Sequence, residues 1–101
     1  MPEALEKAFN DQVTMELASA NAYLQMASYF SHENFEGMSR WMRSQASEER
    51  SHADLFLDFI LDRGGAVTIG EVAAPKSDFT SALDVFETAL AQEESGHGRH
   101  T

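Results

Sequence analysis

The residues best able to do chemistry are a carboxylate and an imidazole three positions apart, Glu49 and His52, inside a long segment with helical periodicity. Side chains three positions apart project from one face of an α-helix, so this pair could bind one metal ion or two adjacent ions. The same face is otherwise mostly apolar, with Met42 and Phe56 on either side of the pair. A carboxylate buried there needs a cation, a hydrogen-bond network or protonation to offset the cost of leaving water. Of these three we expect a metal ion.

Two further carboxylates occupy the same kind of position. Glu16 interrupts an apolar stripe in the first helical segment, and Glu93 lies in line with apolar residues in the last one. Oxygen ligands with one imidazole suit iron or manganese better than structural zinc, which prefers thiolates and histidines. In di-iron carboxylate bundles, two helices each supply a Glu and the other two each supply Glu-x-x-His. Glu16, with Glu49 and His52, makes half of that set, and two copies related by a two-fold axis would complete it.

Three helical segments must position these residues, because apolar residues recur at helical spacing over three stretches of the chain. We expect helices at about 4–32, 35–63 and 81–94. Asn34 is expected to cap the second helix, and Gly64 with Gly65 to end it. The short connection between the first two helices makes them antiparallel neighbours.

The segments between and after the helices have different expected roles. Residues 64–79 have no helical period and are expected to form a long loop that crosses the length of the helices, while residues 95–101 are expected to be a tail. The predicted fold is all-α: one domain over residues 1–101, made of an antiparallel two-helix hairpin, the crossing loop and a short third helix. Because so few helices cannot cover each other's apolar faces, we expect two chains to dimerise into a four-helix bundle.

The charge balance excludes several classes of function. The chain of 101 residues has 17 acidic and 7 basic residues, a formal net charge of −10. Phosphate binding depends on clustered Lys and Arg, so we expect neither nucleic acid nor a membrane surface as a partner. Neither a spanning apolar stretch nor a secretory signal is recognisable, and the expected location is the cytoplasm. An acidic surface would instead attract cations.

The sequence resembles the non-haem bacterial ferritins over nearly its whole length through Glu94. The likeness rests on four places: Met15-Glu16-Leu17 followed by Ala22-Tyr23-Leu24, Asn34-Phe35-Glu36-Gly37-Met38, Gln45-Ala46-Ser47-Glu48-Glu49-Arg50-Ser51-His52-Ala53, and Ala91-Gln92-Glu93-Glu94. The resemblance implies that Glu16, Glu49 and His52 form the first iron site of a di-iron ferroxidase centre, in which Glu49 bridges the two irons.

The same resemblance assigns three more residues. Glu93 matches the carboxylate that the third helix gives to the second iron, Tyr23 matches a tyrosine beside the centre, and Glu48 matches a neighbouring carboxylate for additional iron. In a symmetric dimer, however, a second copy of Glu16 could take the place of Glu93. The implied activity is ferroxidase, the oxidation of Fe(II) to Fe(III), in the service of iron storage or detoxification.

The likeness ends where ferritins continue into further helices. The chain is similar to half a ferritin, as the encapsulated ferritins are, and these rebuild the bundle by dimerising around a shared metal site. The expected partners are therefore a second copy, in a homodimer or larger even-numbered homo-oligomer, with a shell protein or a full-length ferritin as further candidates. Two alternatives remain open: a non-catalytic iron-binding protein, and an assembly module derived from a ferritin.

Overall fold

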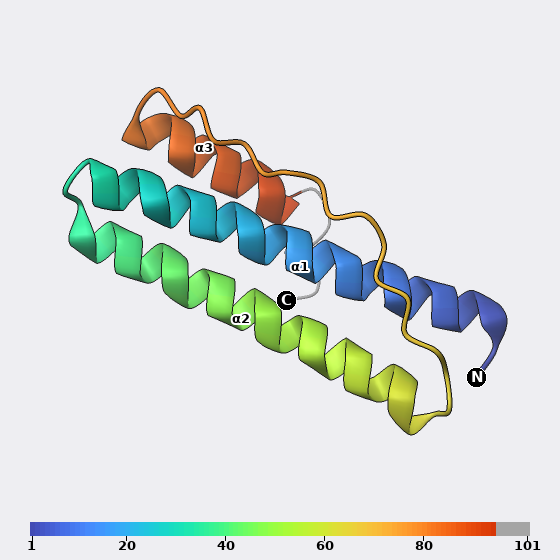
Figure 1. The fold of residues 1–101 in the computed structure, drawn as a ribbon. Helices are drawn as coiled ribbons and strands as arrows, with labels where there is room; N and C mark the ends of the chain where they lie inside the picture. Colours follow the sequence, from blue (N-terminus) through green and yellow to red (C-terminus); the bar gives the residue numbers. More distant parts are fainter. Residues whose placement is uncertain (95–101) are drawn as a thin grey trace.

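Three helices and one long connection form the fold, which a computed structural model describes for residues 1–94 (Figure 1). The helices are α1 (Glu3–His32), α2 (Glu36–Asp62) and α3 (Ala82–Gln92). The all-α class is confirmed, and the first two helices begin and end within one residue of the expected bounds. The expected tail, residues 95–101, lies outside the described residues.

A tight turn joins α1 to α2 and makes them antiparallel. The expectation that Asn34 caps α2 is wrong: the residue before the helix is Phe35, which has no side-chain cap, and Asn34 has a φ of 65°. The amide of Phe35 donates to the carbonyl of Phe30 over 2.7 Å. Reversal of the chain in so few residues requires a left-handed backbone at one position, and asparagine tolerates it better than most residues.

The glycine pair ends α2 as expected, with a different task for each glycine. Gly64 has a φ of 73°, the left-handed conformation that commonly ends helices. Gly65 donates its amide to the carbonyl of Ile60, and a Cβ at this position would lie 2.7 Å from Glu6 Oε1 and 2.9 Å from Ile60 Cγ2. Gly65 is therefore favoured mainly by its close approach to Ile60 of α2, because the end of the Glu6 side chain can move aside.

The connection from α2 to α3 runs beside α1 toward the opposite end of the hairpin (Figure 1). Three polar side chains of α1, each four positions after the last, bind its backbone. The amide of Ala66 donates to Glu6 Oε1 over 2.9 Å. Asn10 donates to the carbonyl of Ala66 and accepts from the amide of Thr68, and Thr14 Oγ1 accepts from the amide of Gly70. These bonds replace the partners that a strand or helix would give to this backbone.

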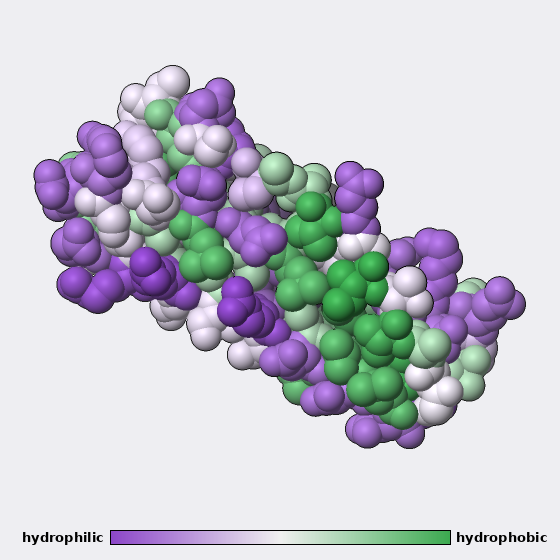
Figure 2. All heavy atoms as spheres, in the orientation of Figure 1, coloured by the Kyte–Doolittle hydropathy of each residue, from purple (hydrophilic) through white to green (hydrophobic). Residues whose placement is uncertain are grey.

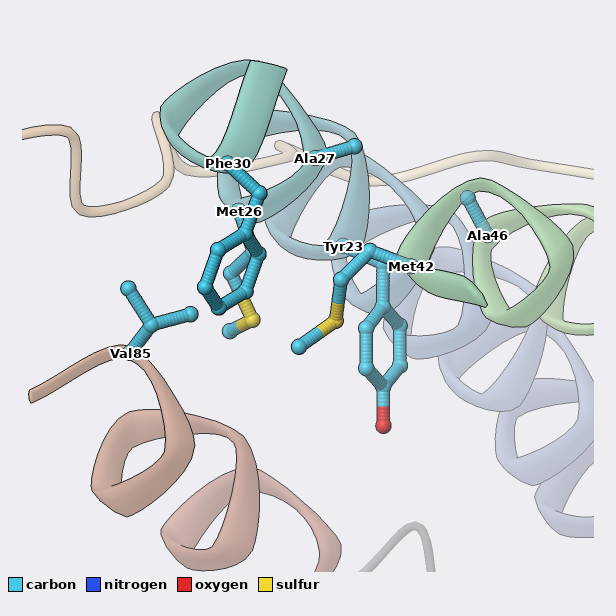
Figure 3. Close-up of a cluster of buried hydrophobic side chains, with 7 residues drawn as sticks. All are labelled: Tyr23, Met26, Ala27, Phe30, Met42, Ala46 and Val85. Atoms are coloured by element: carbon cyan, nitrogen blue, oxygen red, sulfur yellow. The ribbon is translucent and has the colours of Figure 1, made fainter. Parts of the chain in front are cut away.

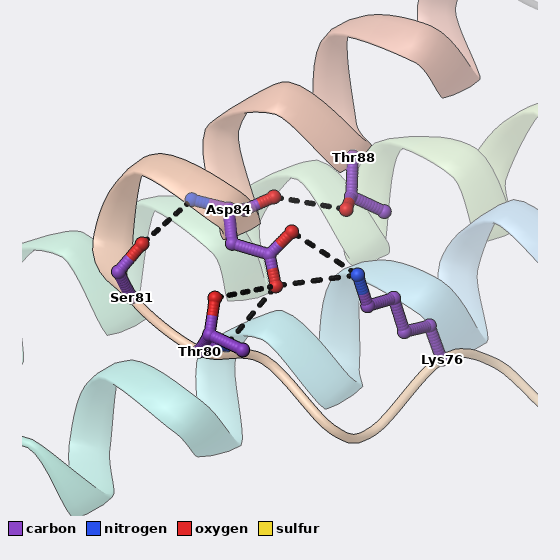
Figure 4. A network of polar contacts seen from close by, with 5 residues as sticks. All are labelled: Lys76, Thr80, Ser81, Asp84 and Thr88. Atoms are coloured by element: carbon purple, nitrogen blue, oxygen red, sulfur yellow. Dashed lines mark hydrogen bonds and ion pairs between the residues drawn. The ribbon is translucent and has the colours of Figure 1, made fainter.

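Hydrogen bonds and an ion pair around Asp84 define the start of α3 (Figure 4). Ser81 is the N-cap residue, and its hydroxyl accepts from the amide of Asp84. The Asp84 carboxylate accepts from the amide of Thr80 and from Lys76, and these contacts hold the pKa of Asp84 below its usual value. The helix therefore begins with both a cap and a negative charge near its N-terminus, which the helix dipole favours.

The core consists of two apolar clusters placed along the hairpin. The larger one joins all three helices near the α1–α2 turn (Figure 3), and its members are Tyr23, Met26, Ala27, Phe30, Met42, Ala46 and Val85. The smaller one lies between α1 and α2 farther from the turn, and comprises Val13, Ala53 and Ile60. Residues 16 and 49 fall between the two clusters in sequence on both helices.

An apolar area remains uncovered where α3 ends. Figure 2 shows it over the half of the hairpin that α3 does not reach. This half includes the N-terminal part of α1 and the C-terminal part of α2, which carry the exposed side chains Leu5, Met15, Leu55 and Leu61. Among the described residues, no helix is both long and apolar enough to cross a membrane.

Candidate metal centre

The antiparallel hairpin brings Glu16 of α1 against Glu49 and His52 of α2. One ligand atom from each of the three side chains lies within 4.8 Å of the other two. His52 Nδ1 is 3.5 Å from Glu16 Oε1 and 3.3 Å from Glu49 Oε1. Only 1% of Glu16 and 4% of Glu49 is exposed. The structure thus gathers the three residues into one cluster of two buried carboxylates and an imidazole.

In each buried carboxylate, the oxygen that does not face His52, Oε2, accepts a hydrogen bond from α1. Gln12, one turn earlier on α1, donates its amide to Glu16 Oε2 over 2.9 Å. Ser19, one turn later on α1, donates its hydroxyl to Glu49 Oε2 over 2.7 Å. Both donors are neutral, so they orient the carboxylates without cancelling their charge. The Oε1 atoms of both carboxylates consequently face the same imidazole nitrogen.

His52 forms the accessible side of the cluster. Its side chain is 47% exposed, in contrast to the two carboxylates. A small cation can therefore approach from the side of the imidazole, while the two carboxylates are buried. Two carboxylate oxygens and one nitrogen offer three ligands, fewer than iron or manganese usually takes in carboxylate sites.

A second polar contact lies one turn farther along α1. Tyr23 is buried in the larger apolar cluster and donates its hydroxyl to Glu93, just after α3. Burial, followed by the hydrogen bond to the Glu93 carboxylate and that carboxylate's charge, raises the pKa of Tyr23 well above its usual value. Tyr23 is thus a neutral donor that holds Glu93 next to the cluster.

Two other expected site residues, Glu48 and Glu93, are not members of this three-residue group. Glu48 is exposed on α2, and Glu93 is half-buried at the end of α3. Sequence reasoning did not identify Ser19 as a donor to the site. Its position three residues after Glu16 places it on the same face of α1, and that spacing was the available signal.

Comparison with known proteins identifies the family of the chain. A model of the ferritin family, described as a ferritin-like domain, matches residues 6–98. The chain belongs to the ferritin family. It is 41% identical over 90 residues to the bacterial non-heme ferritin of Staphylococcus aureus and 36% identical over 91 residues to that of Bacteroides fragilis. These alignments cover 89% and 90% of this chain, and 54% and 57% of the relatives.

Solved structures of ferritins share the fold. An engineered closed form of the Archaeoglobus fulgidus ferritin superposes with a TM-score of 0.89 at 40% sequence identity. That match covers 93% of this chain and 57% of the archaeal one. The open-pore ferritin of the same archaeon gives the same TM-score, with 58% of its chain covered. The chain therefore spans little more than half the length of the ferritins that it matches.

Proposed function

We propose that this ferritin-family chain binds Fe(II) through Glu16, Glu49 and His52 and oxidises it to Fe(III) at a di-iron carboxylate site, in the service of iron storage or detoxification. The observation that carries the proposal is the cluster itself: two carboxylates, nearly inaccessible to solvent, converge with an imidazole inside 4.8 Å. Iron is the substrate of this reaction.

The donor set supports iron in particular. Two carboxylates this close repel each other and have lost most of their solvation, so a divalent cation between them removes a large unfavourable energy. Oxygen ligands with a single imidazole are typical of iron and manganese sites. His52 Nδ1 lies within 3.5 Å of both Oε1 atoms, so one small cation among the three groups would be close to all of these ligand atoms.

Oxidation needs two iron ions, and one chain offers too few ligands for both. We propose that a second copy supplies the remainder, so that two Glu16, two Glu49 and two His52 side chains surround two irons in a four-helix bundle. The uncovered apolar area on the hairpin supports this, because a contiguous exposed apolar surface commonly marks a protein interface (Figure 2). The assembly is then a homodimer or a larger even-numbered oligomer.

The residues have distinct proposed roles in that site. Glu49 bridges the two ions, while Glu16 and His52 each bind one of them. Each Fe(II) gives up one electron, and the pair together reduces O₂, with two protons, to hydrogen peroxide. Glu93 is the candidate for an added ligand from α3, held by Tyr23. Glu48, exposed on α2 beside Glu49, is the candidate for taking up iron outside the pair.

Anaerobic titration of metal-free protein with Fe(II), with the mass followed by light scattering, tests the proposal. The expected result is saturation near one iron per chain on a dimer or larger even-numbered oligomer, followed by oxygen uptake when O₂ is admitted. His52→Ala should abolish stoichiometric binding, whereas His32→Ala should not. His32 is a suitable control because it also faces a neighbouring carboxylate, Glu33, but at the exposed end of α1.

Each other result has a defined meaning. A monomer, or an oligomer that binds no stoichiometric iron, would refute the shared di-iron site. Stoichiometric binding without oxygen uptake would refute the ferroxidase and leave an iron-binding protein. In both cases the family membership of the chain stands, because it rests on the sequence match and the fold.

A further inference from the structure

The last turn of α3 is bonded to the face of α1 that carries the site. Gln92 and Glu93 are adjacent, and they contact Ser19 and Tyr23, which lie four positions apart on α1. Gln92 donates its side-chain amide to Ser19 Oγ over 2.7 Å, across 73 positions of sequence. Residues four apart share one helix face, so the two hydrogen bonds fix both the rotation of α3 about its axis and its position along α1.

Ser19 lies between that contact and the metal centre. Its hydroxyl has one hydrogen and two acceptor lone pairs. Since the amide of Gln92 donates to Ser19 Oγ, the single hydrogen is available for Glu49 Oε2, 2.7 Å away. Ser19 and Glu49 are only 5% and 4% exposed, so water does not compete effectively for either group. A relay therefore runs from α3 through Ser19 to Glu49.

We propose that Ser19 is a positioning residue that fixes the orientation of Glu49 for metal binding, and that Gln92 of α3 holds Ser19 in that role. The inference rests on the proposed metal site. With Oε2 anchored on Ser19, Glu49 presents Oε1 toward His52 and Glu16. Without the anchor the carboxylate is free to rotate, and part of the metal-binding energy is then spent on ordering it.

The other carboxylate has an anchor of a different origin. Gln12 holds Glu16 from within α1, one turn away, so that contact does not depend on α3. The hydrogen bond that anchors Glu49 does depend on α3, because Gln92 contacts Ser19 only when α3 is packed against α1. Docking of α3 is thus coupled, through Ser19, to the orientation of Glu49.

Cobalt(II) binding to the metal-free full chain under anaerobic conditions tests the relay, read from visible absorption. Ser19→Ala should weaken cobalt affinity about tenfold and change the cobalt spectrum, because loss of an outer hydrogen-bond partner typically costs between one and two powers of ten. Ser19→Thr, which retains the hydroxyl, should restore the affinity to within about threefold. Gln92→Leu should weaken cobalt affinity less than Ser19→Ala does. Combined with Ser19→Ala, it should cause no further loss of cobalt affinity.

A matched control is available in Ser39→Ala. Ser39 is a buried serine on α2 whose hydroxyl donates to the carbonyl of Ala27, away from the site. Its removal should lower stability toward urea about as much as Ser19→Ala does, but leave cobalt affinity unchanged. The inference is overturned if the two variants bind cobalt equally well, if Ser19→Thr is as weak as Ser19→Ala, or if the effects of Ser19→Ala and Gln92→Leu add. Failure of the unaltered protein to bind cobalt would overturn the metal site along with it.

Discussion

Glu49→Gln should stabilise the metal-free protein while it removes metal binding. Two full charges no more than 4.8 Å apart repel by about 3.5 kcal/mol at an effective dielectric constant of about 20. Solvent on the side of His52, whose side chain is 47% exposed, reduces this to about 2 kcal/mol. Glutamine keeps the shape and accepts from Ser19 through its carbonyl, but a neutral hydrogen bond is weaker by about 1 kcal/mol. The expected net gain is therefore about 1 kcal/mol.

Urea unfolding with a chelator, and again with Co(II) at a hundred times its dissociation constant, measures both halves of this prediction. The unaltered protein should gain about 2.7 kcal/mol from the metal, and the variant almost none. Protein concentration is held constant, because the stability of an oligomer depends on it. Glu87→Gln, which removes one exposed charge from α3, is the control and should stay within about 0.5 kcal/mol in both conditions.

A loss of stability in metal-free Glu49→Gln would refute the reasoning. It would mean that the protein itself satisfies the second buried charge, and that the cluster is an internal polar network with no need of a cation. An equal response to metal in the variant and the unaltered protein would place the metal elsewhere.

Three further predictions concern the elements that support the site. The raised pKa of Tyr23 means that the folded state favours the neutral phenol, so unfolding free energy should fall as pH rises above the unfolded value of 10.0, and Tyr23→Phe should remove that dependence in urea titrations. The lowered pKa of Asp84 means the opposite: the stability it gives is present above the unfolded value of 3.8 and lost as pH falls through the folded one, so α3 amides should lose hydrogen-exchange protection in acid, less so in Asp84→Asn. Gly65→Ala should lower thermal stability more than Ser81→Ala, which costs about 1 kcal/mol, because the new methyl would meet Ile60 at 2.9 Å and 3.2 Å.

The helices and the central cluster were predictable because both follow from periodicity. In an amphipathic helix, apolar residues recur at alternating spacings of three and four, and the same spacing identifies which residues share a face. Glu16, Glu49 and His52 could therefore be placed on the faces that point toward the core. Once two long helices are joined by a short turn, they must be antiparallel, and those faces must meet. The fold confirms that meeting directly.

What the sequence did not predict are contacts between segments far apart in the chain. The role of Ser19 depends on Gln92, and nothing in local periodicity relates positions that are separated by the crossing loop. Asn34 was misread because asparagine is suited both to helix capping and to the left-handed conformation, and only the geometry of the turn decides between them. The polar side chains that bind the crossing loop were missed because four-residue spacing of polar groups also describes an ordinary solvated helix face.

The crossing loop has a consequence for the order in which the chain folds. The α1–α2 hairpin forms from contacts between neighbours in sequence, whereas α3 must close a long loop before it gains any contact. The stabilisation that α3 gains from packing is small, since Val85 is the only fully buried side chain of this helix. α3 is therefore the last element to join and the first to open, with a local opening energy below that of the hairpin. The hairpin and its two buried carboxylates can exist before the relay from Gln92 is complete, so the final orientation of Glu49 is the closing step of folding.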